Sequence, residues 1–132
     1  MKLLDTTFLV DFLRKKNSVK EKIITLGPPL CTTRINVFET LAGIFSIKLE
    51  ADRRRKLGDF QILFNSLQIL ELDEKSALIA SQISGYLNIQ GNHIEAGDCL
   101  IAGIALSNGI NTIVTKNVKD YQKIEGLKVE GY

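Results

Sequence analysis

The 132-residue sequence contains no tryptophan, one histidine, two prolines and two cysteines. Cys31 and Cys99 lie in apolar runs without CxxC spacing, so we expect two buried thiols in a reducing compartment rather than a disulfide. The single histidine, His93, follows Gly91 and Asn92 in a loop, which favours a solvated surface residue over a catalytic one. The chemistry of this chain therefore has to come from other side chains.

The sequence also lacks a long apolar run and a strong net charge. No stretch approaches the roughly 18 apolar residues of a membrane helix, and the N-terminus MKLLDTTFLVDF carries acids where a signal peptide would be apolar. The net charge is +2, with 45% hydrophobic and 24% charged residues, which is typical of a globular protein and excludes a uniformly basic surface. We therefore expect a cytoplasmic protein without membrane contact, in which any nucleic-acid contact is local.

Strand-like and helix-like segments alternate along the chain. Short apolar runs predict strands at 2–5, 30–33, 67–72, 112–115 and 127–129, the last of them at an edge. Apolar residues at three- and four-residue spacing predict helices at 8–13, 38–49, 52–66, 77–87 and 95–107, and a helical turn at 117–122. Thr6 and Thr7 are expected to cap the first helix. The alternation predicts one domain over residues 1–132, an α/β fold with three α/β/α layers and a mainly parallel central sheet.

Two acids stand at the ends of apolar segments. Asp5 follows the first predicted strand, where a buried charge is costly without partners. The alternative is that Asp5 only caps the next helix. Asp98 lies in the first turn of a nearly uncharged helix, EAGDCLIAGIAL. Its alternative role is a first-turn acid that stabilises the helix dipole by about a few tenths of a kcal/mol.

Two further acids complete the candidate site. Glu39 interrupts the apolar face of its helix beside the small residue Ala42, and the alternative is a solvent-facing side chain. Asp120 follows the fourth predicted strand, although Asn117 with Asp120 also resembles a capping box. Because parallel strands end at one edge of the sheet, we expect the acids to share a pocket. Clustered carboxylates repel each other unless protonated or bridged by a cation, and hard oxygen ligands favour Mg²⁺ or Mn²⁺ over Zn²⁺.

Four segments carry a resemblance to a known family. LLDTTFLVDFLR, INVFETLAGI, EAGDCLIAGIAL and IVTKNVKDY, in this order, resemble the signature segments of PIN-domain proteins of the VapC toxin type, and the resemblance spans essentially the whole chain. It implies a metal-dependent endoribonuclease that acts on RNA with Mg²⁺ or Mn²⁺ and is the toxin of a toxin-antitoxin pair. It further implies a homodimer and a small VapB-like antitoxin whose tail blocks the acidic pocket.

The resemblance also implies roles for individual residues. The acids that align with the family's catalytic site are Asp5, Glu39, Asp98 and Asp120. Asp5 and Asp98 would bind the metal, with Glu39 and Asp120 binding it directly or through water. The supporting polar residues are Thr6, Thr115 and Asn117. The sequence departs from the family pattern at Ala96, where many relatives carry another acid, and at Asn117, where some relatives place the last acid. Either Asn117 or Asp120 therefore completes the site.

Local basic residues are candidates for contacts with RNA phosphates. They are Arg34, Arg53, Arg54, Arg55 and Lys116. The run that begins at Arg53 is equally typical of a solvated helix start.

Two other functions compete with a nuclease. A PIN-like module could bind RNA or protein without cutting, whereas a phosphoacceptor receiver would need paired acids after the first strand, and Asp5 is followed by Thr6.

Overall fold

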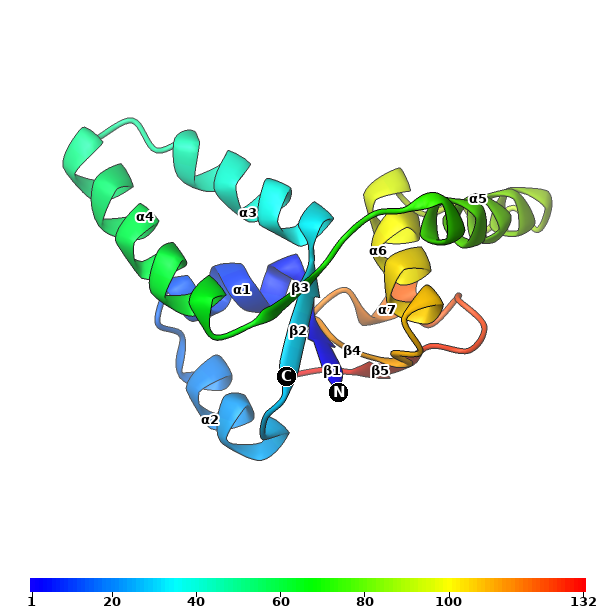
Figure 1. Ribbon diagram of the computed structural model, residues 1–132, viewed down its shortest axis with the longest axis horizontal. Coiled ribbons are helices and arrows are strands. Elements are labelled where there is room, and N and C mark those ends of the chain that lie inside the picture. Colours follow the sequence, from blue (N-terminus) through cyan, green and yellow to red (C-terminus); the bar gives the residue numbers. More distant parts are fainter.

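The computed structural model describes residues 1–132 and contains a five-stranded sheet between two groups of helices (Figure 1). The strands are β1 (Lys2–Leu4), β2 (Leu30–Thr33), β3 (Gln68–Leu70), β4 (Thr112–Val114) and β5 (Lys128–Glu130). They are ordered β3-β2-β1-β4-β5, and every neighbouring pair is parallel. The five predicted strands are therefore all present, β5 lies at an edge as predicted, and the parallel α/β architecture is confirmed.

Seven helices cover the sheet, and one of them was not predicted. They are α1 (Thr6–Leu13), α2 (Asn17–Leu26), α3 (Arg34–Phe45), α4 (Glu50–Asn65), α5 (Glu74–Ile89), α6 (Ala96–Ser107) and α7 (Val118–Tyr121). The missed helix is α2, in which Val19, Ile23 and Leu26 repeat at four- and three-residue spacing and pack against the core, although Val19 alone is fully buried. Helix α3 begins earlier than expected because Thr33 and Asn36 form a capping box ahead of its apolar residues.

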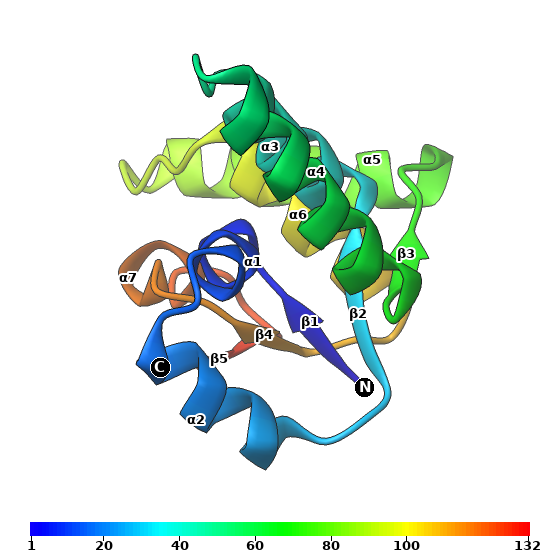
Figure 2. The ribbon, with the colours of Figure 1, turned by 90° about the vertical axis from the view of Figure 1, so that its left-hand side faces the viewer.

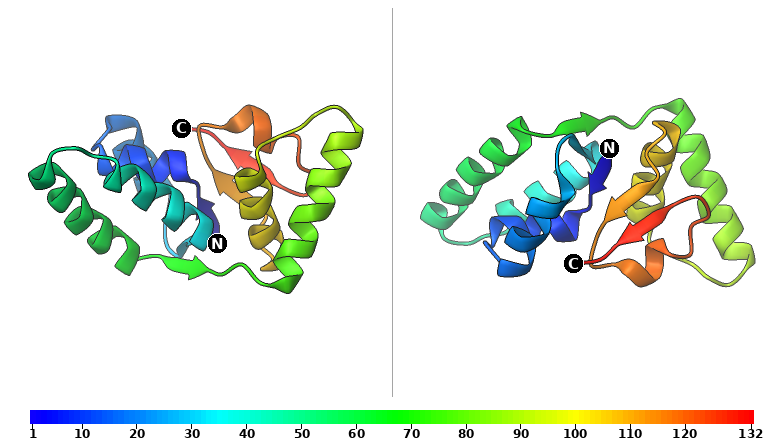
Figure 3. Two further views of the ribbon diagram at one scale, coloured as in Figure 1. Left: turned by 90° about the horizontal axis from the view of Figure 1, so that it is seen from above. Right: turned by 90° about the horizontal axis from the view of Figure 1, so that it is seen from below.

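Alternation along the strands divides the core into two halves. Leu3 and Ile113 belong to a buried cluster with side chains of α5, α6 and α7. The next residues along these strands, Leu4 and Val114, belong to a second cluster with α1, α2, α3 and α4. Successive strand residues point to opposite faces, so each face receives its own helices. Figure 2 shows α1, α2 and α4 in front of the strands, and both views of Figure 3 place α4 and α5 on opposite sides.

Helix α6 lies unusually close to α5. A Cβ added at Gly103 would come within 2.6 Å of the Ser76 carbonyl oxygen and 2.7 Å of the Ala80 Cβ. Only glycine permits this approach, and Ala102 and Ala105 beside it are fully buried. The small residues of α6 allow this close packing, and the contact holds the helix that carries Asp98 in place.

Two other features bear on the sequence-based expectations. Cys31 and Cys99 are both buried and unpaired, as predicted. No helix combines the length and the apolar character that crossing a membrane requires.

Candidate active site

Asp5 follows β1 directly and is 3% exposed. Its Oδ1 accepts hydrogen bonds from Asn36 Nδ2 at 3.2 Å and from the Tyr121 hydroxyl at 3.1 Å, and its Oδ2 accepts from Thr115 Oγ1 at 2.6 Å. Asp5 occupies the N-cap position of α1, but its side chain makes no capping hydrogen bond. The capping alternative for Asp5 is therefore wrong, and so is the expectation that Thr6 and Thr7 cap this helix, because both lie inside it.

Glu39 projects from α3 toward α6 and is only partly exposed. The Thr6 hydroxyl donates to its Oε1 at 2.5 Å, and a Cβ at Gly97 would lie 3.0 Å from its Oε2. Burial raises the pKa of the Glu39 carboxyl; the Thr6 hydrogen bond opposes this, while the charges of Asp5 and Glu95 add to the increase. Glu39 is thus part of the cluster around Asp5, and the solvent-facing alternative is wrong.

Asp98 lies in the first turn of α6, facing Asp5. Its Oδ1 accepts from the Tyr121 hydroxyl at 3.1 Å, and its Oδ2 accepts from Asn117 Nδ2 at 3.0 Å. Burial and the charge of Asp5 raise the pKa of the Asp98 carboxyl to about 6, although the Tyr121 hydrogen bond opposes this. The charge of a neighbouring acid therefore contributes to the raised pKa of both Asp98 and Glu39.

Asp120 lies outside this hydrogen-bonded cluster. It belongs to the first turn of α7, and its Oδ1 is 3.5 Å from Lys123 Nζ. Its charge contributes to the raised pKa of Asp98 less than burial and the other acids do. Asn117 makes no capping hydrogen bond, so the predicted capping box is absent and the Asn117 amide contacts Asp98 instead.

Two residues of the cluster were not identified from the sequence. Asn36 is fully buried and donates to Asp5 Oδ1 and, at 2.9 Å, to Thr6 Oγ1, while its own Oδ1 accepts from the Thr33 backbone N–H. Tyr121 is also fully buried, and its hydroxyl contacts two carboxylates. Asn36 lies three residues before Glu39 on the same helix face, and that spacing was the available signal.

The basic candidates for RNA contact all have partners within the chain. Arg53 donates to the Ile47 carbonyl oxygen. The ion pairs of the others are Arg34 with Glu71, Arg54 with Glu50, Arg55 with Asp52, and Lys116 with Asp11. None of these residues forms an ion pair with Asp5, Glu39 or Asp98, so the acids are held by neutral donors alone. Contact between the basic residues and RNA stays a prediction.

The donor set fits a hard divalent cation that needs few protein ligands. No three Asp, Glu, His or Cys side chains are spaced to hold one ion together. Asp5 and Asp98, however, both reach the same Tyr121 hydroxyl. Mg²⁺ typically binds one or two carboxylates and completes its shell with water and substrate phosphate. Asp5 and Asp98 provide two neighbouring carboxylates that repel each other and have no cationic partner, and they therefore match this requirement.

Comparison with known proteins identifies the family of this chain. The family model of the PIN domain matches residues 2–127. The tRNA(fMet)-specific endonuclease VapC of Shigella flexneri is 26% identical over 131 residues, covering 98% of this chain and 96% of the relative. Among solved structures, FitAcB from Neisseria gonorrhoeae matches with a TM-score of 0.86 and 26% identity, covering 98% of this chain and 96% of that one. DNA-bound VapBC from Salmonella typhimurium matches with a TM-score of 0.87 and 24% identity, with the same coverage. The chain therefore belongs to the PIN-domain family.

Proposed function

We propose that this chain is a divalent-metal-dependent endoribonuclease and the toxin of a VapBC-type toxin-antitoxin pair. The observation that carries the proposal is the convergence of Asp5 and Asp98, which have only neutral hydrogen-bond donors around them. Burying a carboxylate without a counter-charge lowers the stability of a fold. Such a loss of stability is expected at residues that serve binding or catalysis. The relative named as an endonuclease, VapC of Shigella flexneri, supports the same reaction.

The side chains around the acids would prepare the site for RNA. Asn36 and Thr115 hold the two oxygens of Asp5, Asn117 holds Asp98, and Thr6 holds Glu39. A bound Mg²⁺ or Mn²⁺ would supply an activated water and stabilise negative charge on the attacked phosphate. The role of the protein is then to fix carboxylate orientation before the phosphodiester arrives, because preorganised groups need no rearrangement during the reaction.

Cleavage of RNA by the purified wild-type protein tests this function. We expect single-stranded or looped RNA to be shortened with Mg²⁺ or Mn²⁺ and to stay intact with EDTA. A binding module would shift RNA in a native gel without shortening it in a denaturing gel. A receiver would take up phosphate from a small phosphodonor and leave RNA untouched. Either of these last two results would contradict the nuclease.

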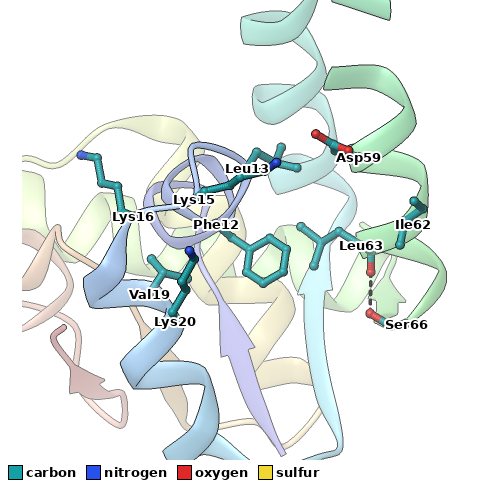
Figure 4. Close-up of a pocket in the computed structure, with 10 residues that line it drawn as sticks. All are labelled: Phe12, Leu13, Lys15, Lys16, Val19, Lys20, Asp59, Ile62, Leu63 and Ser66. Carbon is teal, nitrogen blue, oxygen red and sulfur yellow. Dashed lines mark hydrogen bonds between the residues drawn. The ribbon is translucent and has the colours of Figure 1, made fainter. Parts of the chain in front are cut away.

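We further propose a docking groove for an acidic, amphipathic antitoxin segment between α1, α2 and α4. This pocket has a volume of about 480 Å³. In Figure 4, Phe12 and Leu63 point into the gap between the helices and Val19 lies on the α2 side. Three lysines, Lys15, Lys16 and Lys20, also line it, together with one acid, Asp59, so its charged lining is net positive. An apolar floor with a cationic rim is complementary to a helix with an apolar face and acidic flanks. The relatives solved as VapBC complexes make an antitoxin the matching kind of partner.

Two isoleucines provide a matched test of this groove. Ile62 lines it and is 74% exposed, whereas Ile24 on α2 is 83% exposed and does not line it. Ile62→Asp should abolish co-purification with a co-expressed antitoxin, since it places a charge on the exposed apolar edge of the groove, and Ile24→Asp should not. Equal co-purification of both variants would exclude the groove.

The homodimer implied by the sequence resemblance is also part of the proposal. Phe38 and Phe45, on α3, are 69% and 61% exposed, and large apolar side chains in contact with water favour burial against a partner. A second copy of the chain is the partner we propose. Light scattering should give twice the monomer mass for wild type and the monomer mass for Phe45→Asp. A monomeric wild-type protein would contradict this assembly.

A further inference from the structure

The Tyr121 hydroxyl is the single atom that contacts both Asp5 and Asp98. It lies 3.1 Å from Oδ1 of each carboxylate. A phenol carries one proton, so it can donate fully to only one of two ionised carboxylates at a time. The Tyr121 hydroxyl therefore orients both carboxylates toward one shared point. Because it is a neutral donor, it does not compensate their combined charge.

The position of this hydroxyl is set by the core rather than by the acids. The Tyr121 ring is fully buried in the cluster formed with α5 and α6. Its backbone N–H donates to the Asn117 carbonyl oxygen at 3.3 Å, and its own carbonyl oxygen accepts from the Ile124 N–H at 3.1 Å. A ring held in this way cannot follow the carboxylates if they move apart, so it acts as a fixed reference point for them.

We propose that Tyr121 is a positioning residue that holds Asp5 and Asp98 at the separation and orientation required to bind one divalent cation together. The inference rests on the proposed metal-dependent function, which it deepens. Hydrogen bonds to metal-binding side chains orient them and commonly change metal affinity 10- to 100-fold. Without the hydroxyl, mutual repulsion would turn the two carboxylates away from each other, and a cation could no longer reach both at low cost.

The chain contains a matched control at a different carboxylate. The Tyr132 hydroxyl donates to Asp11 Oδ2 at 2.9 Å, and Asp11 also pairs with Lys16 and Lys116. Tyr132→Phe and Tyr121→Phe therefore remove the same atom from a tyrosine-carboxylate contact, fully buried at Tyr121 and partly buried at Tyr132. Only Tyr121 joins two acids, so only its loss should affect a cation site.

Calorimetric titration of the full chain with MnCl₂ tests the inference directly. We expect Tyr121→Phe to raise the Mn²⁺ dissociation constant at least about tenfold and Tyr132→Phe to leave it within about a factor of two of wild type. Melting temperatures in EDTA would report any loss of stability common to both variants. A Tyr121→Phe protein that binds Mn²⁺ as wild type does would overturn the inference and leave the proposed function intact. A wild-type protein that binds no Mn²⁺ would overturn both.

A second measurement decides the matter if Tyr121→Phe does not fold. The chain has three tyrosines, so ring-labelled wild-type protein gives three resolvable phenol carbon signals in NMR spectra. Saturating Mg²⁺ should shift the signal of Tyr121, because a cation shared by Asp5 and Asp98 changes what its hydroxyl donates to, and should leave that of Tyr132 in place. An unchanged Tyr121 signal under Mg²⁺ that is shown to bind would overturn the inference.

Discussion

Two buried aspartates illustrate, at the scale of single residues, how differently one side-chain type can be stabilised. Asp11 is 4% exposed and has Lys116 and Lys16 at 2.6 and 3.1 Å. Burial by itself raises its pKa, but hydrogen bonds from Lys116, Tyr132 and Lys16 outweigh this and hold the pKa at about 2. Asp5 is as deeply buried and receives only neutral donors. The first arrangement stabilises the fold, whereas the second leaves the Asp5 carboxyl without a cationic partner.

Asp98 should destabilise the metal-free protein at neutral pH. Its folded-state pKa of about 6 lies above the ordinary aspartate value of 3.8, so the native state binds the proton more tightly. The stability contributed by this proton is fully present below about pH 4 and is lost as the pH rises through about 6. In EDTA, the free energy of unfolding of Asp98→Asn relative to that of wild type should therefore increase as the pH rises from about 4 to above about 6.

Chemical denaturation of both proteins at pH 4.5 and pH 8, values chosen to bracket about 6, measures this difference. Asp98→Asn should be folded at both pH values, and its stability relative to wild type should be greater at pH 8 than at pH 4.5. A loss of more than about 2 kcal/mol upon substitution would instead assign Asp98 a structural role.

At the scale of elements, the sequence is most informative where a whole segment is buried. The strands were predicted because they are short apolar runs, and helix α6 because it is a nearly uncharged apolar segment. Helix α2 was missed although Val19, Ile23 and Leu26 repeat at helical spacing, because charged and polar residues separate them. The roles of Asn36 and Tyr121 depend on contacts 31 and 116 positions away along the chain, and no local pattern encodes which of many polar residues will meet a given acid. The four acids could be chosen from local properties, because Asp5, Asp98 and Asp120 follow strands or begin helices and Glu39 interrupts the apolar face of its helix.

Gly97 in α6 should be required for the placement of Glu39. Gly→Ala within a helix usually stabilises by about 0.5–1 kcal/mol, but here the added Cβ would lie 3.0 Å from Glu39 Oε2. We expect Gly97→Ala to fold and to lose RNA cleavage several-fold, because small displacements of active-site groups are costly. Gly85→Ala in α5, where no atom lies within 4 Å of the new Cβ, is the control. Equal cleavage rates for the two variants would show that Glu39 tolerates the displacement.

At the scale of the whole molecule, the sheet brings distant segments to one edge. β1 lies between β2 and β4, so Asp5 meets residues that follow both neighbours, Asn36 beyond β2 and Thr115 beyond β4. The central position of β1 was not predicted, because strand pairing is a long-range property. Asp120 was expected at this edge and lies near it, outside the hydrogen-bonded cluster.

Cation binding should stabilise the entire fold, because a ligand bound only by the native state raises the free energy of unfolding. Saturating Mn²⁺ should raise the melting temperature of wild type and have much less effect on Asp5→Asn, which lacks one of the two proposed ligands. Equal increases for both proteins would place the bound ion elsewhere.

The measurement that tests the account most directly is the rate of Mn²⁺-dependent RNA cleavage by single variants of the proposed site. Asp5→Asn, Glu39→Gln and Asp98→Asn should each lose nearly all activity, and combining them should cost little more, since groups that act as a unit are not additive. Asp120→Asn should keep part of the activity, because Asn117 and Thr115 already occupy the cluster, and Asp59→Asn on α4 should keep all of it. Full, EDTA-resistant cleavage by Asp5→Asn and Asp98→Asn would contradict the metal-dependent nuclease and point to a contaminating ribonuclease.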